Sequence, residues 1–212
     1  MTPAHSWLRS LNCDGRFGGC LLGLLAVLGC LALGGEPTLL ALRYERTALA
    51  HGEWWRLLSA HFVHLGVRHL LLDSAAVVLL WVLYARELSA SLWIFVLLGT
   101  IGTIDAGLWW ANPQVLWYVG VSGVLHGVWA AGAAHSVWRD ARRELTGWLL
   151  LAALGGKLLY EYRAGESLLV ASFPVVTAAH RYGALGGLLA LALCSALGAG
   201  ARAAIIKRTA SE

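Results

Sequence analysis

Charged residues are scarce in this sequence. Asp, Glu, Lys and Arg make up only 13% of its 212 residues, whereas hydrophobic residues make up 58%. This is too little charge to cover the surface of an ordinary water-soluble globule of the same size. The composition therefore excludes most soluble classes and predicts an all-α protein that lies in a lipid bilayer.

Cysteines are few, and the basic residues form no continuous stripe. Three of the four cysteines fall within apolar segments, which excludes a disulfide framework and favours free thiols. The net charge of +4 comes from residues spread over connecting segments, so no nucleic-acid partner is expected. Repeats, low-complexity segments and interdomain linkers are also missing, so residues 1–212 are interpreted as one domain.

Long apolar runs predict six membrane helices. Their approximate ranges are 17–34, 70–85, 92–110, 119–137, 145–160 and 175–200. Asp73 and Lys157 interrupt the second and the fifth. The first run also has features of a cleaved signal peptide, but its length favours a helix that is retained. The segment 35–66 between the first two runs is expected to be mainly a solvated connection.

The basic residues also predict an orientation. With the N-terminus in the cytoplasm, inside segments would hold nine basic residues and outside segments five. The inside set is Arg9, Arg16, Arg86, Arg139, Arg142, Arg143, Arg202, Lys207 and Arg208, and the outside set is Arg43, Arg46, Arg56, Arg68 and Arg163. This bias predicts that both termini are cytoplasmic. The starts of the fourth and sixth runs would then face the outer side.

One short stretch stands out at the start of the fourth run, Gly120-Val-Ser122-Gly-Val-Leu-His-Gly127. A hydroxyl in the first turn of a helix lies beside unpaired backbone N–H groups and the positive end of the helix dipole. Such a position stabilises an oxygen that becomes negative during a reaction. The alternative interpretation is helix packing, because Gly123 and Gly127 have the spacing of a small-xxx-small contact.

A second stretch opens the last run, Ala179-His180-Arg-Tyr-Gly183-Ala-Leu-Gly-Gly187. His180 and the glycines at i+3 and i+7 share one helix face. Glycines let a neighbouring backbone come close, so we expect the two glycine faces to pack and to bring Ser122 within reach of His180. A serine beside a histidine is the arrangement that activates a nucleophile. His126 is a competing base on spacing alone and is interpreted as a packing residue.

These stretches resemble the rhomboid family of intramembrane serine proteases, whose marks are Gly-x-Ser-Gly on one helix and Ala-His-x-x-Gly-x-x-x-Gly on the last. The resemblance covers about residues 50–200. It implies a six-helix bundle with a catalytic pair of Ser122 and His180 and with no metal or cofactor. No third carboxylate stands out as a partner for the histidine. It also implies a bacterial inner (cytoplasmic) membrane, with the active site towards the extracytoplasmic side.

The ending Leu125-His126-Gly127 of the serine motif is more similar to the rhombosortase branch of this family. That branch implies a membrane-anchored substrate with a C-terminal sorting tail, in which a Gly-Gly start precedes an apolar helix and a basic end. Either water or an amine would then release the acyl group. The family also has a partly embedded hairpin with a Trp-Arg pair, which Trp55-Arg56 matches and for which a structural role is expected.

A third family mark is a histidine-rich start of the second helix that ends in His-x-x-x-Asn, and residues 61–73 resemble it. The resemblance assigns His69 and Asp73 to the oxyanion site. Because an ionised carboxylate would repel the oxyanion, Asp73 is expected to be protonated and to donate a hydrogen bond, or else to turn towards a basic neighbour. His61, His64 and His69 also suggest zinc, but no His-Glu-x-x-His motif accompanies them.

Four charged residues lie inside the predicted membrane helices, where each is costly unless it is paired: Asp105, Lys157, Glu161 and Arg181. The first expectation is that Asp105 and Arg181 form an ion pair with each other or with Lys157 and Glu161. The alternative is functional, because Lys157 and Glu161 are spaced i, i+4 and would together face the route of the substrate.

Two other classes of protein compete with a protease. A non-catalytic rhomboid-like protein would bind transmembrane helices without cutting them, but such proteins lose the serine or the histidine, and this chain keeps both. A small transporter would show related halves or helices interrupted at matching positions, and the sequence has neither.

Overall fold

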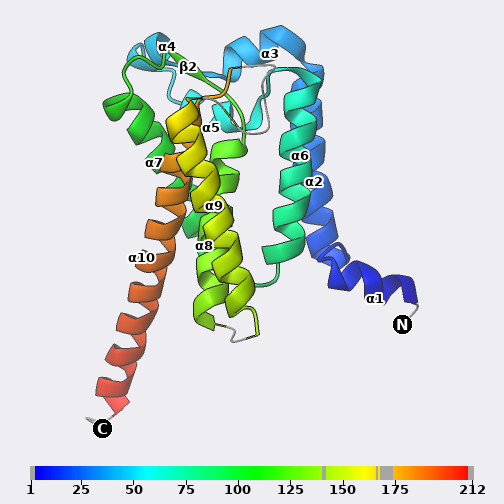
Figure 1. Ribbon diagram of the computed structural model, residues 1–212, viewed down its shortest axis with the longest axis vertical. Coiled ribbons are helices and arrows are strands. Elements are labelled where there is room, and N and C mark those ends of the chain that lie inside the picture. The colour runs from blue at the N-terminus through cyan, green and yellow to red at the C-terminus, as the bar shows by residue number, and fades with distance from the viewer. Residues whose placement is uncertain (1–2, 140–141, 166, 168–173, 210–212) are drawn as a thin grey trace.

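The computed structural model describes residues 3–139, 142–165, 167 and 174–209. It is a bundle of long helices with a layer of short elements at one end (Figure 1). In chain order the elements are α1 (Pro3–Ser10), α2 (Gly15–Leu33), α3 (Gly35–Leu42), β1 (Tyr44–Glu45), α4 (Arg46–Ala50), α5 (Arg56–Ser59), the 3-10 turn η1 (Ala60–Phe62), α6 (Gly66–Tyr84), α7 (Ala90–Ala106), the π-helical turn η2 (Gly107–Ala111), β2 (Trp117–Tyr118), α8 (Ser122–Arg139), α9 (Glu144–Ala164) and α10 (Thr177–Thr209).

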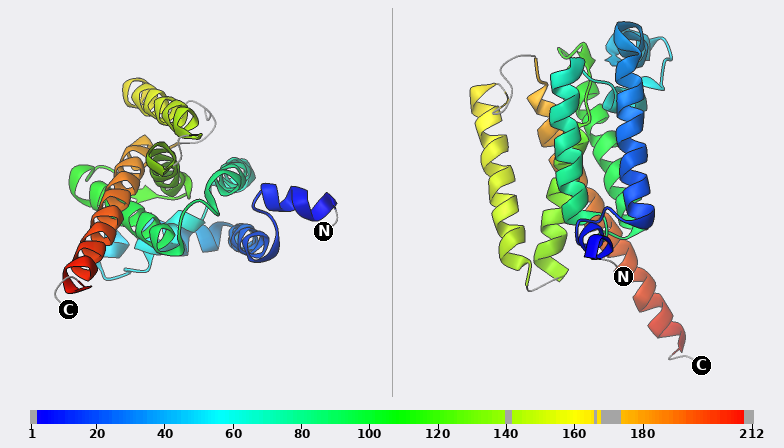
Figure 2. Two further views of the ribbon diagram at one scale, coloured as in Figure 1. Left: turned by 90° about the horizontal axis from the view of Figure 1, so that it is seen from below. Right: turned by 90° about the vertical axis from the view of Figure 1, so that its right-hand side faces the viewer.

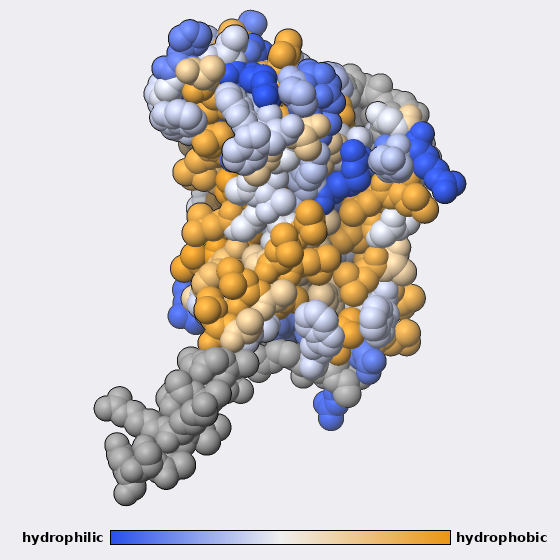
Figure 3. Space-filling model, turned by 90° about the vertical axis from the view of Figure 1, so that its left-hand side faces the viewer, coloured by the Kyte–Doolittle hydropathy of each residue, from blue (hydrophilic) through white to orange (hydrophobic). Residues whose placement is uncertain are grey.

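A long helix covers most of each apolar run. Among the described residues, four helical stretches are long and apolar enough to cross a membrane: Gly15–Leu33, Gly66–Tyr84, Ala90–Ala111 and Thr177–Gly198. The helices α8 and α9 are not among them, so six membrane crossings stay a prediction. A broad apolar band lies between polar ends on the face that Figure 3 shows, as expected of a multi-pass membrane protein.

The segment 35–66 is not the solvated connection that its sequence suggests. It folds into the short elements α3 to η1, and Tyr44, Leu49, Ala60 and His61 within it are completely buried. The strand β1 pairs with β2 in an antiparallel arrangement that places Tyr44 opposite Tyr118. This layer therefore packs onto the end of the bundle.

Arg56 fixes the layer from inside. Its guanidinium donates hydrogen bonds to the carbonyl oxygens of Leu40 and Arg43, at 2.8 and 2.9 Å, and to the carboxylate of Glu53 at 2.7 Å. The indole N–H of Trp55 donates to the carbonyl of Ala41. These contacts support the structural role expected for the Trp55-Arg56 pair.

Helix α8 starts three residues later than its apolar run, at Ser122. The delay follows from Gly120, whose φ of +110° lies in a region that L side chains rarely adopt. A side chain there would also collide with the His69 ring, 2.8 Å from an added Cβ. The hydroxyl of Tyr118 donates to the Gly120 carbonyl at 2.8 Å and supports this turn. Ser122 is thereby placed in the first turn of α8.

Glycines set how closely α8 and α10 approach. A Cβ added to Gly183 would lie 2.0 Å from the carbonyl oxygen of Gly123, and one added to Gly187 would lie 2.1 Å from that of Gly127. The two backbones are therefore in direct contact along the face that carries Ser122 and His180. Helix α10 also packs along α7.

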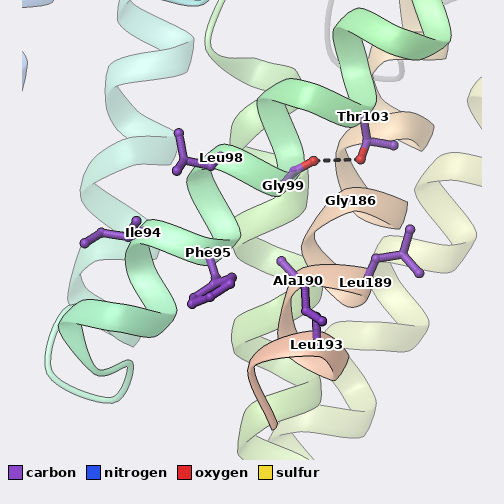
Figure 4. A pocket seen from close by; sticks show the side chains of 9 residues that line it. All are labelled: Ile94, Phe95, Leu98, Gly99, Thr103, Gly186, Leu189, Ala190 and Leu193. Atoms are coloured by element: carbon purple, nitrogen blue, oxygen red, sulfur yellow. Dashed lines mark hydrogen bonds between the residues drawn. The ribbon is translucent and has the colours of Figure 1, made fainter. Parts of the chain in front are cut away.

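The contact between α7 and α10 is of the same kind. A Cβ added to Gly186 would lie 2.7 Å from the carbonyl oxygen of Gly99, whose oxygen also accepts a hydrogen bond from Thr103 at 2.6 Å. Beside it lies a groove lined by apolar side chains such as Phe95 and Leu193 (Figure 4). Its lining contains no titratable residue, so this groove is not a candidate for catalysis.

The helix α9 lies at the edge of the bundle beside α8 (Figure 2). Helix α1, the junction of α8 with α9 and the C-terminal part of α10 all lie at the end opposite the layer of short elements (Figure 1). At this end Arg86 donates a hydrogen bond to Asp14 at 2.5 Å, which lowers the pKa of that carboxyl. Arg143 pairs with Glu87 there as well.

The glycine contact between α8 and α10 yields the first prediction. The substitution Gly187→Ala should lower the free energy of unfolding by about 1–3 kcal/mol, because the added methyl overpacks a backbone contact. Thermal unfolding in detergent measures the effect. Gly102→Ala is the matched control, because a Cβ at Gly102 meets nothing within 4 Å. Equal midpoints for the two variants would contradict the close contact.

Candidate active site

Ser122 and His180 meet where the first turns of α8 and α10 lie side by side. The Ser122 Oγ atom lies 3.0 Å from the Nε2 atom of His180. The imidazole is 3% exposed, so water does not compete freely for this contact. A hydroxyl at this distance from an imidazole nitrogen can transfer its proton to that nitrogen.

The other side of the His180 ring faces a carboxylate. The Nδ1 atom lies 2.8 Å from Oε2 of Glu161, a residue of α9 with no exposed surface. The other oxygen of Glu161 accepts a hydrogen bond from the Lys157 ammonium at 2.5 Å. Lys157 and Glu161 thus share a face of α9, as their spacing indicates, and they pair with each other. No local pattern indicates that Glu161 also reaches His180.

His126 stacks on His180 and does not face the serine hydroxyl. The ring centroids lie 4.1 Å apart and the planes differ by 12°. Its Nδ1 atom lies 2.7 Å from the backbone carbonyl oxygen of Ser122, to which it donates. The serine hydroxyl therefore contacts His180, whereas His126 packs on the face of the His180 ring.

His69 and Asp73 form a second polar group on α6. The carboxylate oxygen Oδ2 of Asp73 lies 3.1 Å from Nε2 of His64 and 3.4 Å from Nε2 of His69. The backbone N–H of Leu65 donates to Nδ1 of His69, so the ring proton of His69 is on Nε2. Asp73 thus turns towards two histidines and acts as an acceptor. The arrangement favours the second of the two expectations for this residue.

A cavity of about 360 Å³ connects the two polar groups. His69, Asp73, Ser122 and His180 all line it, and Lys157 reaches it from α9. The rest of its wall is mostly apolar and comes from α6, α8 and α9. A cavity of this kind suits an apolar segment of a membrane-anchored chain.

The histidines do not form an evident zinc site. His61 lies 3.5 Å from Asp105, whereas His64 and His69 share Asp73. Among the described residues, the group with metal-like spacing is His126, Glu161 and His180. Because the two rings of this group are stacked, their in-plane lone pairs do not converge on one point. The donor set therefore suits hydrogen bonding better than tetrahedral coordination.

Comparisons with known proteins identify the family of the chain. The model of the rhomboid domain matches residues 51–197. The chain belongs to the rhomboid family. Its members are generally intramembrane serine proteases. The chain is also 28% identical, over 152 residues, to a protein of Bacillus subtilis (strain 168) named "Putative rhomboid protease YdcA", and the match covers 69% of this chain and 70% of that protein.

Asp105 and Arg181 contact residues that differ from those expected from the sequence. Asp105 was expected to form an ion pair with Arg181 or with the charges of α9, but it lies against His61. Arg181 lies over the ring of Tyr162, 5.2 Å from its centroid. The first contact joins η1 to α7, and the second joins α9 to α10. The spacing of residues along a single helix therefore predicts neither of them.

The histidine contacts of Asp73 yield the second prediction. Asp73→Asn should keep or raise turnover, because the amide oxygen still accepts from His64 while the negative charge near the oxyanion is removed. Asp73→Leu should lower the free energy of unfolding by about 1–3 kcal/mol, because buried donors lose their acceptor. Cleavage rates and thermal midpoints of both variants test this. An Asp73→Asn enzyme that is inactive at every pH would show that the carboxylate itself is required.

Proposed function

We propose that this protein is an intramembrane serine endopeptidase in which Ser122 is the nucleophile and His180 is the general base. The observation that carries the proposal is the 3.0 Å separation of Ser122 Oγ and His180 Nε2, in a buried site that opens onto an apolar cavity. Membership in the rhomboid family supports it.

The reaction proceeds in two steps. His180 Nε2 accepts the proton of Ser122 as Oγ attacks a peptide carbonyl, and the same proton then passes to the amine that leaves. The product is an ester between Ser122 and the acyl part of the substrate. In the second step His180 takes a proton from water, the resulting hydroxide attacks the ester, and the serine hydroxyl is restored. If an amine replaces water, the same proton transfers give a new amide.

Two donors stabilise the oxyanion in this proposal. The backbone N–H of Ser122 belongs to the first turn of α8 and has no acceptor four residues before it within the helix. The Nε2–H of His69 faces the same cavity and is held on its other side by the Leu65 N–H. If this N–H donates to the oxyanion in place of Asp73, it provides the second hydrogen bond.

The substrate in this proposal is a membrane-anchored protein whose cleavage site reaches the cavity between α6 and α9. A C-terminal sorting tail, with Gly-Gly followed by an apolar helix and a basic end, is the substrate that the rhombosortase-like ending Leu125-His126-Gly127 favours. Small residues at the cleavage site would fit beside Ser122, and the apolar helix would lie along the apolar wall of the cavity.

The orientation in this proposal follows from the distribution of basic residues. The end opposite the layer of short elements carries α1, the start of α2, the junction of α8 with α9 and the C-terminal part of α10. These segments include Arg9, Arg16, Arg142 and Arg143. This end is assigned to the cytoplasm of a bacterium. The end with Ser122 and His180 then lies towards the extracytoplasmic side of the inner membrane.

The third prediction concerns the catalytic pair. Ser122→Ala and His180→Ala should each lower cleavage of a membrane-anchored substrate by about 10⁴-fold or more, and the double variant should be hardly worse than either, because the two residues act as one unit. A fluorophosphonate that labels active serines should label the wild type in native membranes and should not label Ser122→Ala.

Thermal unfolding serves as the control, because all three variants should stay folded. Turnover by Ser122→Ala would end the proposal that Ser122 is the nucleophile. A wild type that neither cleaves a membrane-anchored substrate nor reacts with the fluorophosphonate would favour a protein that only binds transmembrane helices. Turnover by His180→Ala, together with an inactive His126→Ala, would move the base to His126.

The fourth prediction concerns orientation. In a background without native cysteines, Ala50→Cys should react with a membrane-impermeant thiol reagent in intact cells, and Arg142→Cys should react only after the membrane is opened. Both positions are exposed, so accessibility of the side chain does not limit the comparison. The reverse pattern would overturn the proposed topology.

A further inference from the structure

Glu161 is a buried residue beside the catalytic pair that the proposed mechanism does not use. It is completely buried, and each of its carboxylate oxygens has a partner: Lys157 at 2.5 Å and His180 at 2.8 Å. A buried charge in a membrane protein is costly and is retained where it serves the structure or the function. The ammonium of Lys157 already balances the charge of Glu161 through one carboxylate oxygen. The contact with His180 therefore needs its own explanation.

The contact determines which nitrogen of His180 carries the proton. A carboxylate only accepts hydrogen bonds, so Nδ1 of His180 must be the protonated nitrogen. Nε2 is then left with a lone pair, and this is the atom that faces Ser122 Oγ. Without Glu161 the ring would be free to adopt the other tautomer, in which Nε2 is protonated and cannot accept the serine proton.

The contact also determines the orientation of the ring. His180 is held by Glu161 at Nδ1 and by the stacked ring of His126 on its face. These two contacts come from α9 and α8, whereas His180 itself belongs to α10. Three helices thus fix one imidazole, which leaves it little rotational freedom.

The charge of Glu161 matters when the base becomes protonated. An imidazolium that forms beside a carboxylate in a site shielded from water is stabilised by it. Lys157 keeps Glu161 in position through the opposite oxygen and balances its charge at rest. Glu161 lies on the far side of the ring from Ser122, so its negative charge is separated from the developing oxyanion by the imidazole.

We propose that Glu161 is a positioning residue for the catalytic base, and that the site works as a Ser122, His180, Glu161 triad anchored by Lys157. This inference rests on the proposed function, because it assigns a third member to the same site. Glu161 does not touch the substrate; it acts through His180.

The fifth prediction uses variants that change charge and keep shape. Replacement of Glu161 alone would leave Lys157 unpaired in the membrane, so the main variant is the double substitution Lys157→Met, Glu161→Gln. Its kcat per active serine should fall by about 10²- to 10⁴-fold relative to Lys157→Met. Its KM should stay within about two-fold of that variant, because both lack the ammonium that lines the cavity and substrate binding does not involve the lost carboxylate. Active serines are counted by complete labelling with a fluorophosphonate at long reaction times.

Three controls accompany this variant. Glu144→Gln removes one carboxylate from an exposed position of the same helix and should leave kcat unchanged. Lys157→Met alone keeps the carboxylate and should cost less than the double substitution. Glu161→Asp keeps the charge but is one methylene shorter, so it should recover part of the lost kcat, and it replaces the main variant if the double substitution does not fold.

The outcomes separate this inference from the proposed function. If Ser122→Ala still cleaves the substrate, the proposed function fails and the triad fails with it. If Ser122→Ala is inactive but the folded double variant keeps the kcat of the wild type, the protease proposal stands and the role of Glu161 is overturned. A lower thermal midpoint with an unchanged kcat per active serine would show that Glu161 is only structural. A folded Glu161→Asp with the kcat of the wild type would also contradict positioning.

Discussion

The close backbone contact between α8 and α10 sets the distance between Ser122 and His180. Gly183 and Gly187 have no room for a side chain against the carbonyl oxygens of α8. Serine has a short side chain, so the 3.0 Å approach of Ser122 and His180 requires the helices that carry them to touch. A bilayer offers little hydrophobic force to press helices together, and contacts between small residues supply the attraction instead. Packing and chemistry thus depend on the same glycines.

Beside the cavity, two buried carboxylates accept hydrogen bonds from the histidines and the lysine that surround them. Glu161 receives Lys157 and His180, and Asp73 receives His64 and His69. Each carboxylate thus contacts a histidine that lines the cavity. Glu161 accepts from Nδ1 of His180, and Asp73 accepts from Nε2 of His69. The same pairing that makes the charges tolerable also orients the imidazoles that the proposed mechanism needs.

The sequence predicted the helices and the two motifs because both depend on local patterns, namely apolar length and glycine spacing. It failed where contacts join distant segments. Tyr44 pairs with Tyr118 across β1 and β2, and the ring of His61 contacts the ring of Tyr118. The burial of both residues therefore depends on a distant segment, which no local pattern reveals. The link from Glu161 to His180 likewise joins α9 to α10. A charged i, i+4 pair inside an apolar helix was the available signal, and it indicated only that both residues face inwards.

The two helices that fall short of the apolarity of a membrane span, α8 and α9, are those that carry Ser122 and the Lys157–Glu161 pair. For α8 the reason is enclosure, since it packs against α6, α7, α9 and α10 and its polar residues meet protein. Helix α9 lies at the edge of the bundle, and its low mean hydropathy comes from one polar side that faces the protein. Glu161 is fully buried, whereas Leu149, Leu159 and Tyr162 are exposed, so the lipid-facing side is largely apolar. A mean hydropathy averages the two sides. It therefore underestimates how well a helix suits the membrane when the charges in its central turns, here Lys157 and Glu161, face the site.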